Sequence, residues 1–355
     1  MSAGPNNLLA ASLVEKDKNG DTLWTWTYPS VDEGLRELLL RKTCLAEKDS
    51  NEIVPFSFGH FGRMWYYVLT VAAGDSEPLA QVTHFTVIVH AKDFNPEKYQ
   101  HLASILAETY RTTGNAARLL ENYLSVVTRG VCSGVGDIED FAVKSYDVRK
   151  AYIASSIKDV IQQLGIEAIL VYTALLLKKR VAVYHPDIQQ LLNIVRALPT
   201  LVWHRQNWSI VYPHVHLVED ELEDLASTSS YVAGFTDSSV ESHANLYDVF
   251  VNVAGGAITV APHAKEAFGM GKIHKDIATR MVQCSEDEDM TDQAMIKEIA
   301  LKTKDLINNL KSLAVEDEET GEPVVTPDAL RGRKLTPAME NFLYHLASAE
   351  GLVKF

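Results

Sequence analysis

Cysteine is scarce in this chain of 355 residues: Cys44, Cys132 and Cys284 are the only three and lie far apart. An odd number of cysteines does not fit a fully paired disulfide framework, and these spacings do not match the closely spaced pairs of zinc-binding motifs. The sequence therefore excludes a small disulfide-stapled secreted domain. It predicts a reducing compartment, which we expect to be the cytosol.

Long apolar runs are also missing. The longest, at residues 168–177, is about half the length that a helix needs to cross a bilayer. The first residues, Met1-Ser-Ala-Gly-Pro, lack the charged-then-apolar layout of a secretory signal. We therefore expect no direct membrane insertion, and contact with membranes only through partners.

Positive charge is in the minority, with 33 basic against 47 acidic residues and a net charge of −14. The longest basic run is Lys178-Lys179-Arg180. Nucleic acids and anionic membranes attract proteins with extended basic patches. The composition therefore disfavours both, and we expect no nucleic-acid partner.

Recognisable catalytic motifs are lacking too. The sequence has no G-x-S-x-G elbow, and Gly269-Met-Gly-Lys272 lacks both the first glycine and the Mg²⁺-binding hydroxyl of a phosphate loop. His214 and His216 share one face of a strand, as in some metal hydrolases, and Glu219 and Asp220 follow them. No further ligand group occurs at a recognisable spacing, so structural or surface roles are favoured over a metal site. We predict no catalytic residue, no metal and no cofactor, and a protein that acts by binding.

The length and an apolar content of 46% indicate two or three domains with ample cores. The first 130 residues alternate strand and helix patterns, and Asn19-Gly20 is a hairpin signal because both residues tolerate positive φ. We expect strands at 8–14, 23–28, 53–58, 64–72 and 82–89, and helices at 31–42, 96–110 and 116–127. The glycine-rich, acidic stretch at 130–140 is typical of a linker.

The centre of the chain alternates helix and strand at a pace that implies a sheet covered on both faces. We expect helices at 166–177, 188–197 and 220–226, and strands at 181–184, 231–235, 248–253 and 257–260. Beyond residue 262 the pattern is helical, at 264–271, 274–282, 294–313 and 337–346. Two acidic loops, 286–289 and 316–319, are expected to be solvated and mobile. Ser285 is either a phosphorylation site or an ordinary surface serine.

The central motifs resemble the central segment of a DENN domain, at residues 174–184, 198–203, 208–216 and 231–234. Further motifs, at 94–99, 202–206, 247–252 and 340–345, are similar to a small stand-alone member of that family. The resemblance implies an α/β protein: a longin-like module (1–130), a linker (131–145), a doubly wound α/β DENN module (146–261) and a helical C-terminal subdomain (262–355).

The resemblance also implies a function. DENN proteins act as guanine nucleotide exchange factors for Rab GTPases, so the expected partner is a Rab GTPase, GDP-bound or nucleotide-free, in late endosomal or secretory vesicle trafficking. The alternative is a non-catalytic scaffold or adaptor subunit of an endosomal recycling assembly, with subunits of that assembly as partners. In either case we expect a cytoplasmic protein held peripherally on late endosomes or related vesicles. A third hypothesis is stimulation of GTP hydrolysis by an inserted arginine, with Arg63 and Arg129 as candidates.

Candidate partner-binding residues follow from position. Open α/β sheets bind ligands at the carboxyl ends of their strands. The candidates at the carboxyl end of the central predicted strand are Tyr184, His185 and Asp187. The candidates in the aromatic loop that ends at Trp208 are Trp203, His204 and Arg205. For each residue the competing hypothesis is a structural role, such as anchoring the edge of the sheet by the two tryptophans.

Overall fold

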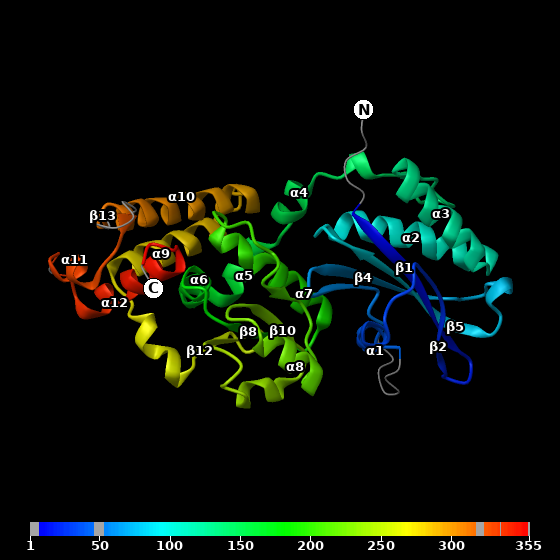
Figure 1. Cartoon of the computed structure of the whole chain (residues 1–355), viewed down its shortest axis with the longest axis horizontal. Coiled ribbons are helices and arrows are strands. Elements are labelled where there is room, and N and C mark those ends of the chain that lie inside the picture. Colours follow the sequence, from blue (N-terminus) through cyan, green and yellow to red (C-terminus); the bar gives the residue numbers. More distant parts are fainter. Residues whose placement is uncertain (1–6, 46–52, 317–322, 334, 354–355) are drawn as a thin grey trace. The chain divides into compact units, whose positions relative to one another are not determined.

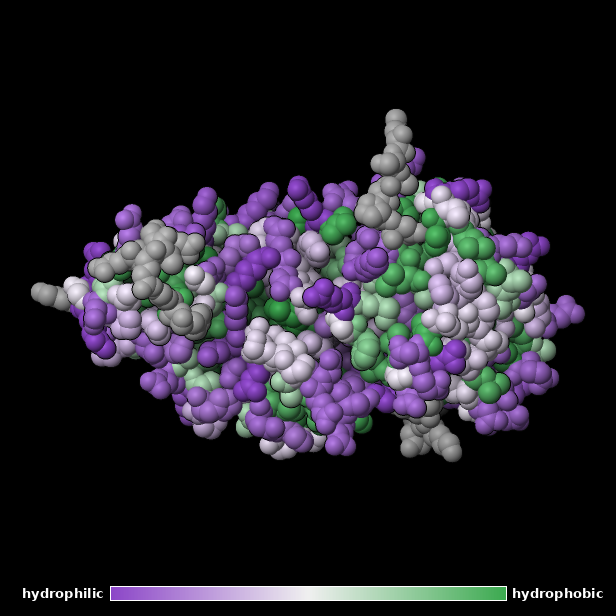
Figure 2. Space-filling model, viewed as in Figure 1, coloured by the Kyte–Doolittle hydropathy of each residue, from purple (hydrophilic) through white to green (hydrophobic). Residues whose placement is uncertain are grey.

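The computed structural model describes residues 7–45, 53–316, 323–333 and 335–353. The chain divides into two compact units, Met1–Ala154 and Ser155–Phe355, each with its own β-sheet and covering helices (Figure 1). The α/β class expected from the sequence is confirmed. Hydrophilic residues cover much of the face shown in Figure 2, with smaller hydrophobic areas between them, in keeping with a charged content of 23%.

The N-terminal unit is built on a five-stranded antiparallel sheet of order β2-β1-β5-β4-β3. The predicted hairpin is confirmed, and Gly20 in its turn has a φ of 90°, which favours glycine. One strand starts later than expected, after Pro55, which has no N–H for the ladder. The strands are β1 (Leu8–Asp17), β2 (Thr22–Tyr28), β3 (Phe56–Phe61), β4 (Met64–Ala72) and β5 (Val82–Ala91).

Helices cover both faces of this sheet. On one face, Leu35 and Leu39 of α1 (Glu33–Lys42) pack with Val14, Val68 and Ile88. On the other face, α2 (Pro96–Thr113) stacks Tyr99 on Tyr67, with ring centroids 4.6 Å apart. A turn of 3₁₀ helix, η1 (Glu77–Leu79), precedes β5, and α3 (Ala116–Arg129) packs beside α2. The order of two strands, a helix, three strands and two helices is the expected one.

The segment predicted as a linker, 131–145, packs against α2. It forms β6 (Val131–Cys132), β7 (Phe141–Ala142) and η2 (Val143–Ser145), and α4 (Val148–Ile153) follows. The Phe141 side chain is buried, and the Glu139 carbonyl oxygen lies 2.9 Å from Nε2 of His101 in α2. The division between the two units therefore lies after Ala154, further along the chain than the predicted linker.

The C-terminal unit contains a second five-stranded sheet, of order β12-β11-β8-β10-β9. Four strands are parallel, and β12 joins the edge antiparallel to β11. The central strand, β8, is buried over its first three residues. The strands are β8 (Val181–Tyr184), β9 (Val211–Tyr212), β10 (Val232–Phe235), β11 (Val249–Asn252) and β12 (Ala257–Val260).

Both faces of the parallel sheet are covered, as its continuous apolar strands require. The helices α6 (Ala168–Leu176) and α7 (Ile188–Ala197) cover one face, and α8 (Glu219–Ala226) and η5 (Ser238–Ser242) cover the other. Gly234 in β10 allows a close approach: a Cβ there would lie 2.2 Å from the Pro213 carbonyl oxygen. Glycine at this position therefore lets the segment after β9 lie against β10.

The remaining helices of this unit lie towards the C-terminus, apart from α5 (Ile157–Leu164), η3 (Gly165–Glu167) and η4 (Leu198–Val202). The predicted helix at 264–271 is instead a 3₁₀ segment that starts at a proline, η6 (Pro262–Phe268). The others are α9 (Lys272–Glu286), α10 (Asp292–Lys311), α11 (Pro327–Arg331) and α12 (Pro337–Ala349), with a short ribbon of β13 (Val315–Glu316) and β14 (Pro323–Val324).

The first acidic loop, 286–289, is exposed as expected, and hydrogen bonds from α5 hold its backbone. Lys158 of α5 donates from Nζ to the carbonyl oxygens of Asp287 and Met290, both at 2.6 Å.

Ser285 is buried and donates its hydroxyl to the Val282 carbonyl oxygen at 2.8 Å, so its interpretation as an exposed serine is wrong. Most of the second acidic loop lies outside the described residues.

One stretch of the described chain, Val148–Leu176, is long and apolar enough to cross a membrane. It is divided into α4, α5, η3 and α6, and most of its apolar part is buried inside the protein. These are the properties of helices that build a protein core.

An ion pair fixes the central strands against each other. The backbone N–H of Arg180 donates to Oδ2 of Asp248 at 2.8 Å, and the Arg180 guanidinium reaches both carboxylate oxygens at 3.3 Å. Asp248 is buried, which alone would raise the pKa of its carboxyl, but the hydrogen bonds from Arg180 hold that pKa below its usual value. Because these residues precede Val181 and Val249, which pair directly, the contact sets the register of β8 and β11.

Replacement of Asp248 by alanine should therefore lower the free energy of unfolding by about 3 kcal/mol, because it leaves a partly buried guanidinium without its partner. The double variant R180M/D248A should cost less than the sum of the two single variants, with a coupling of about 1.5 kcal/mol. Urea unfolding measures both quantities.

The matched control is Asp328→Ala, which breaks an exposed pair with Arg331 and should change the unfolding free energy by less than about 0.5 kcal/mol. Equal losses in D248A and D328A would show that the buried pair does not set the register.

Candidate functional site

The carboxyl edge of the C-terminal sheet brings together residues that are far apart in the sequence. Tyr184 at the end of β8 pairs with Phe235 of β10 on one side and with Asn252 of β11 on the other. Since these strands are parallel and in register, the segments that follow them emerge side by side. Open α/β sheets place their ligands at this edge.

The predicted residues Tyr184, His185 and Asp187 lie here together. Tyr184 is half-buried against the core that contains Phe235. The Asp187 backbone N–H donates to Nδ1 of His185 at 3.1 Å, and the exposed Asp187 carboxylate caps α7 by accepting from the Gln190 N–H at 2.8 Å. Asp187 thus has a structural task and also presents a negative charge to solvent.

Sequence reasoning did not place two further residues at this edge: Asp237, which it did not consider, and His214, which it considered only as a possible metal ligand. The Asp237 carboxylate, after β10, accepts from the Ser239 N–H at 2.9 Å, and this hydrogen bond lowers the pKa of Asp237. His214, after β9, lies with its Nε2 atom 3.2 Å from the Thr236 hydroxyl. The strand pattern could have located them, because parallel strands end at the same edge of a sheet and the residues that follow each strand therefore lie near Tyr184.

The two histidines of the segment after β9 have different partners. Nδ1 of His216 lies 3.2 Å from the Glu221 carboxylate of α8, whereas His214 faces Thr236. Their rings are 4.5 Å apart. Within the described ranges, no three His, Cys, Asp or Glu side chains are grouped so as to hold a metal ion.

The predicted residues Trp203, His204 and Arg205 lie at the opposite edge, where β8 begins. Arg205 donates from Nη1 to the Leu175 carbonyl oxygen and from Nη2 to the Leu176 carbonyl oxygen, both at 2.7 Å. It thereby satisfies the C-terminal carbonyls of α6. The Glu350 carboxylate, at the end of α12, accepts from Arg205 and lies 3.2 Å from Nε2 of His204.

The two tryptophans meet edge to face, with ring centroids 6.0 Å apart. Trp208 is 3% exposed and donates from Nε1 to the Arg196 carbonyl oxygen at 3.1 Å, whereas Trp203 is half-buried. These contacts give the loop between them a structural role. The structure therefore brings Tyr184, His185 and Asp187 together and separates them from Trp203, His204 and Arg205, whose part in an interface stays a prediction.

The two arginines considered for stimulating GTP hydrolysis are both exposed in the N-terminal unit. Arg63 lies in the turn between β3 and β4, beside Gly62. Arg129 ends α3 and donates from Nη2 to the Ser125 hydroxyl at 2.7 Å.

The sequence was compared with protein families and with known proteins to identify the family of this chain. A family model described as "SPA: Stabilization of polarity axis" matches residues 154–262, which include the parallel sheet. Proteins named DENN domain-containing protein 10 match almost end to end: 49% identity with that of Danio rerio (99% of both chains), 46% with that of Mus musculus (98% of this chain, 97% of the relative) and 39% with that of Dictyostelium discoideum (96% of both). The chain belongs to the DENN domain-containing protein 10 family. The resemblance identified from the sequence motifs is confirmed.

Membership of the DENN domain-containing protein 10 family extends over both units, because the matches cover at least 96% of this chain. The family model, at residues 154–262, covers the first part of the C-terminal unit, from its start to just beyond β12. The carboxyl edge, with Tyr184 and Asp187, therefore lies inside the segment that the family model describes.

The contact of Glu350 with Arg205 and His204 predicts a pH dependence of stability. Burial alone would raise the pKa of Glu350, but hydrogen bonds from His204 and Arg205 lower it to about 2. A carboxyl with a depressed pKa stabilises the fold above its unfolded pKa, and this contribution is lost as the pH falls through the folded pKa. The wild type should therefore lose of the order of 2 kcal/mol between pH 4.5 and pH 2 that Glu350→Gln does not lose.

Urea unfolding of the wild type and E350Q at several acidic pH values measures this difference. Glu340→Gln, at a partly exposed position of the same helix, serves as the control and should follow the wild type. Parallel curves for the wild type and E350Q would contradict the assignment of a structural role to this contact.

Proposed function

We propose that this chain is a guanine nucleotide exchange factor for a Rab GTPase. The observation that carries the proposal is similarity to DENN domain-containing protein 10 along nearly the whole chain. Exchange activity toward Rab GTPases is the function that the DENN resemblance implies. The similarity covers both the N-terminal and the C-terminal unit, so the proposal concerns the whole chain. Rab GTPases in general are thus the proposed class of partner.

The proposed mechanism uses binding energy alone. An exchange factor binds the nucleotide-free GTPase more tightly than the loaded one, and by linkage it weakens nucleotide binding by the same factor. Each tenfold acceleration of GDP release requires about 1.4 kcal/mol of barrier reduction. No proton transfer or covalent step is needed.

The carboxyl edge of the C-terminal sheet is the proposed contact surface. It presents the exposed carboxylates of Asp187 and Asp237, both held in place by helix-capping hydrogen bonds, and the half-buried His185 beside them. Fixed carboxylates lose little freedom when a partner docks, so a basic segment of the GTPase can pair with them at a low entropic cost.

We place this activity in the cytoplasm, peripherally on late endosomes or related secretory vesicles, with partners supplying the membrane contact. The net charge of −14 supports recruitment by a partner rather than by an anionic bilayer.

The test is release of fluorescent GDP from a panel of purified Rab GTPases, with and without the full chain at micromolar concentration. Acceleration of one or a few members is the expected result. A uniformly flat panel would contradict exchange activity and leave a scaffold in an endosomal recycling assembly as the function to examine, by affinity purification of stable partners.

Variants at Asp187 separate a contact role from a structural one. Asp187→Asn keeps an oxygen that can cap α7 but removes the charge, so stability should change by less than about 0.5 kcal/mol while the exchange rate falls about five- to tenfold. Asp187→Ala should lose the same activity and also about 1 kcal/mol of stability. GDP release and thermal unfolding are measured on both variants.

Asp276→Asn, which removes one exposed carboxylate from α9, is the control for net charge. If D187N and D276N accelerate GDP release as well as the wild type, the carboxyl edge is not the contact surface.

A further inference from the structure

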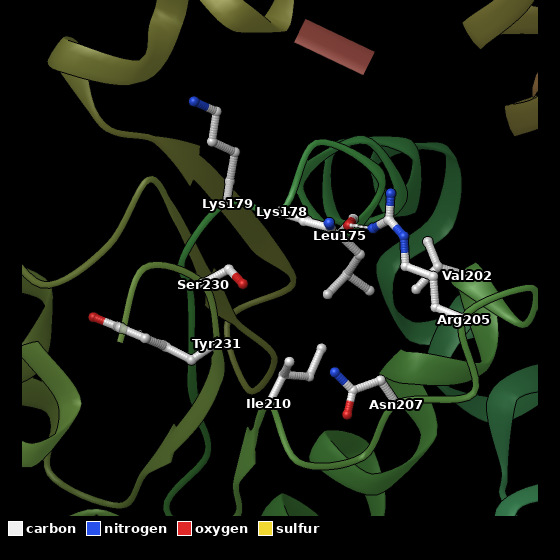
Figure 3. A pocket seen from close by; sticks show the side chains of 9 residues that line it. All are labelled: Leu175, Lys178, Lys179, Val202, Arg205, Asn207, Ile210, Ser230 and Tyr231. Carbon is white, nitrogen blue, oxygen red and sulfur yellow. Dashed lines mark hydrogen bonds between the residues drawn. The ribbon is translucent and has the colours of Figure 1, made fainter. Parts of the chain in front are cut away.

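A small pocket opens at the amino edge of the C-terminal sheet, where β8, β9 and β10 begin. Its volume is about 60 Å³, enough for a single tetrahedral oxyanion and far too small for a nucleotide. Leu175, Val202 and Ile210 form its apolar walls, and polar groups come from the turn after α6, from the loop after η4 and from the residue before Tyr231 (Figure 3).

The polar groups that face this pocket are hydrogen-bond donors. The side-chain oxygen of Asn207 accepts from the N–H and the hydroxyl of Ser209, at 3.0 and 2.6 Å, which leaves its amide nitrogen directed into the pocket. The Ser230 hydroxyl points the same way (Figure 3). Lys178 supplies an ammonium group at the rim, and Lys179 adds a second cation that extends outward.

These cations are not neutralised inside the described part of the chain. The charge of Arg205, at the same rim, is balanced by Glu350, whereas the ammonium groups of Lys178 and Lys179 meet no acidic side chain among the described residues. In a chain of net charge −14, two unpaired lysines beside converging donors form a local anion-attracting site.

Backbone strain is concentrated at the same place. Three non-glycine residues of the described chain have a positive φ, and two of them border this pocket: Lys178 at 51° and Gln206 at 44°. Lys178 occupies the position after the α6 C-cap that glycine usually takes, and the Lys179 N–H closes the turn onto the Ala174 carbonyl oxygen at 2.8 Å. Strained residues persist where structure and function require them. Lysine here keeps a cation at the rim that glycine could not supply.

We propose that this pocket binds a phosphate monoester group through Lys178, Asn207 and Ser230, with Lys179 adding long-range attraction. A doubly charged oxyanion matches the converging donors Lys178, Asn207 and Ser230 and the second cation Lys179, and the small volume admits the phosphate alone. The proposal is independent of the exchange activity, because it concerns the opposite edge of the sheet.

Inorganic phosphate is the first probe. Titration at constant ionic strength, followed by calorimetric binding and thermal unfolding, should show one saturable site in the full chain. Lys178→Gly should weaken phosphate binding at least tenfold. The same variant should raise the unfolding temperature of the phosphate-free protein by about 2–4 °C, because glycine relieves the strained φ. Loss of binding together with a gain in stability is not produced by misfolding.

Lys302→Gln, which removes an exposed lysine from α10, is the matched control and should bind phosphate like the wild type. A second arm uses vesicles with and without a phosphorylated inositol lipid. Binding in both arms assigns the site to a lipid head group, and binding of free phosphate alone assigns it to a soluble phosphate monoester. Equal phosphate responses in the wild type and K178G, or no response in either arm, would overturn the proposal.

Discussion

The hydrogen-bonded pair of Arg180 and Asp248 is the constraint on which the C-terminal unit depends. It joins the residues that precede β8 and β11 and so fixes the register of two buried parallel strands. A shift of one residue would turn every side chain of β8 to the opposite face. The same register decides which residues reach each edge: Tyr184 with His185 at one, Lys178 at the other.

The two edges that follow from this register differ in chemistry. The carboxyl edge presents the capping carboxylates of Asp187 and Asp237, and the amino edge presents the ammonium groups of Lys178 and Lys179, which meet no acidic side chain among the described residues. A parallel sheet separates them because the segments before and after each strand emerge on opposite sides. This separation keeps the carboxylates of the proposed protein-binding surface away from the proposed anion, and the lysines of the pocket away from a basic partner segment.

Local pattern predicted the strand at 181–184 and the helix at 188–197 with their observed bounds, because burial and an N-cap at Asp187 agree there. It did not predict the packing of Phe141, because contacts with α2 outweigh the glycine-rich composition of that segment. Nor could it predict that Arg205 would be held by Leu175, Leu176 and Glu350, since such partners are brought together only by tertiary structure. The sequence located Tyr184, His185 and Asp187 at the carboxyl edge but did not place Asp237 or His214 there.

Exchange by preferential binding to the nucleotide-free GTPase is tested most directly by two affinities of the full chain, one for the nucleotide-free and one for the GDP-bound state of the same Rab GTPase. Biolayer interferometry measures both, on the Rab GTPase whose GDP release the chain accelerates most. Exchange by linkage predicts at least about tenfold tighter binding to the nucleotide-free state, or about 1.4 kcal/mol. Equal affinities for the two states would contradict it, because a protein that does not discriminate between them cannot shift nucleotide release.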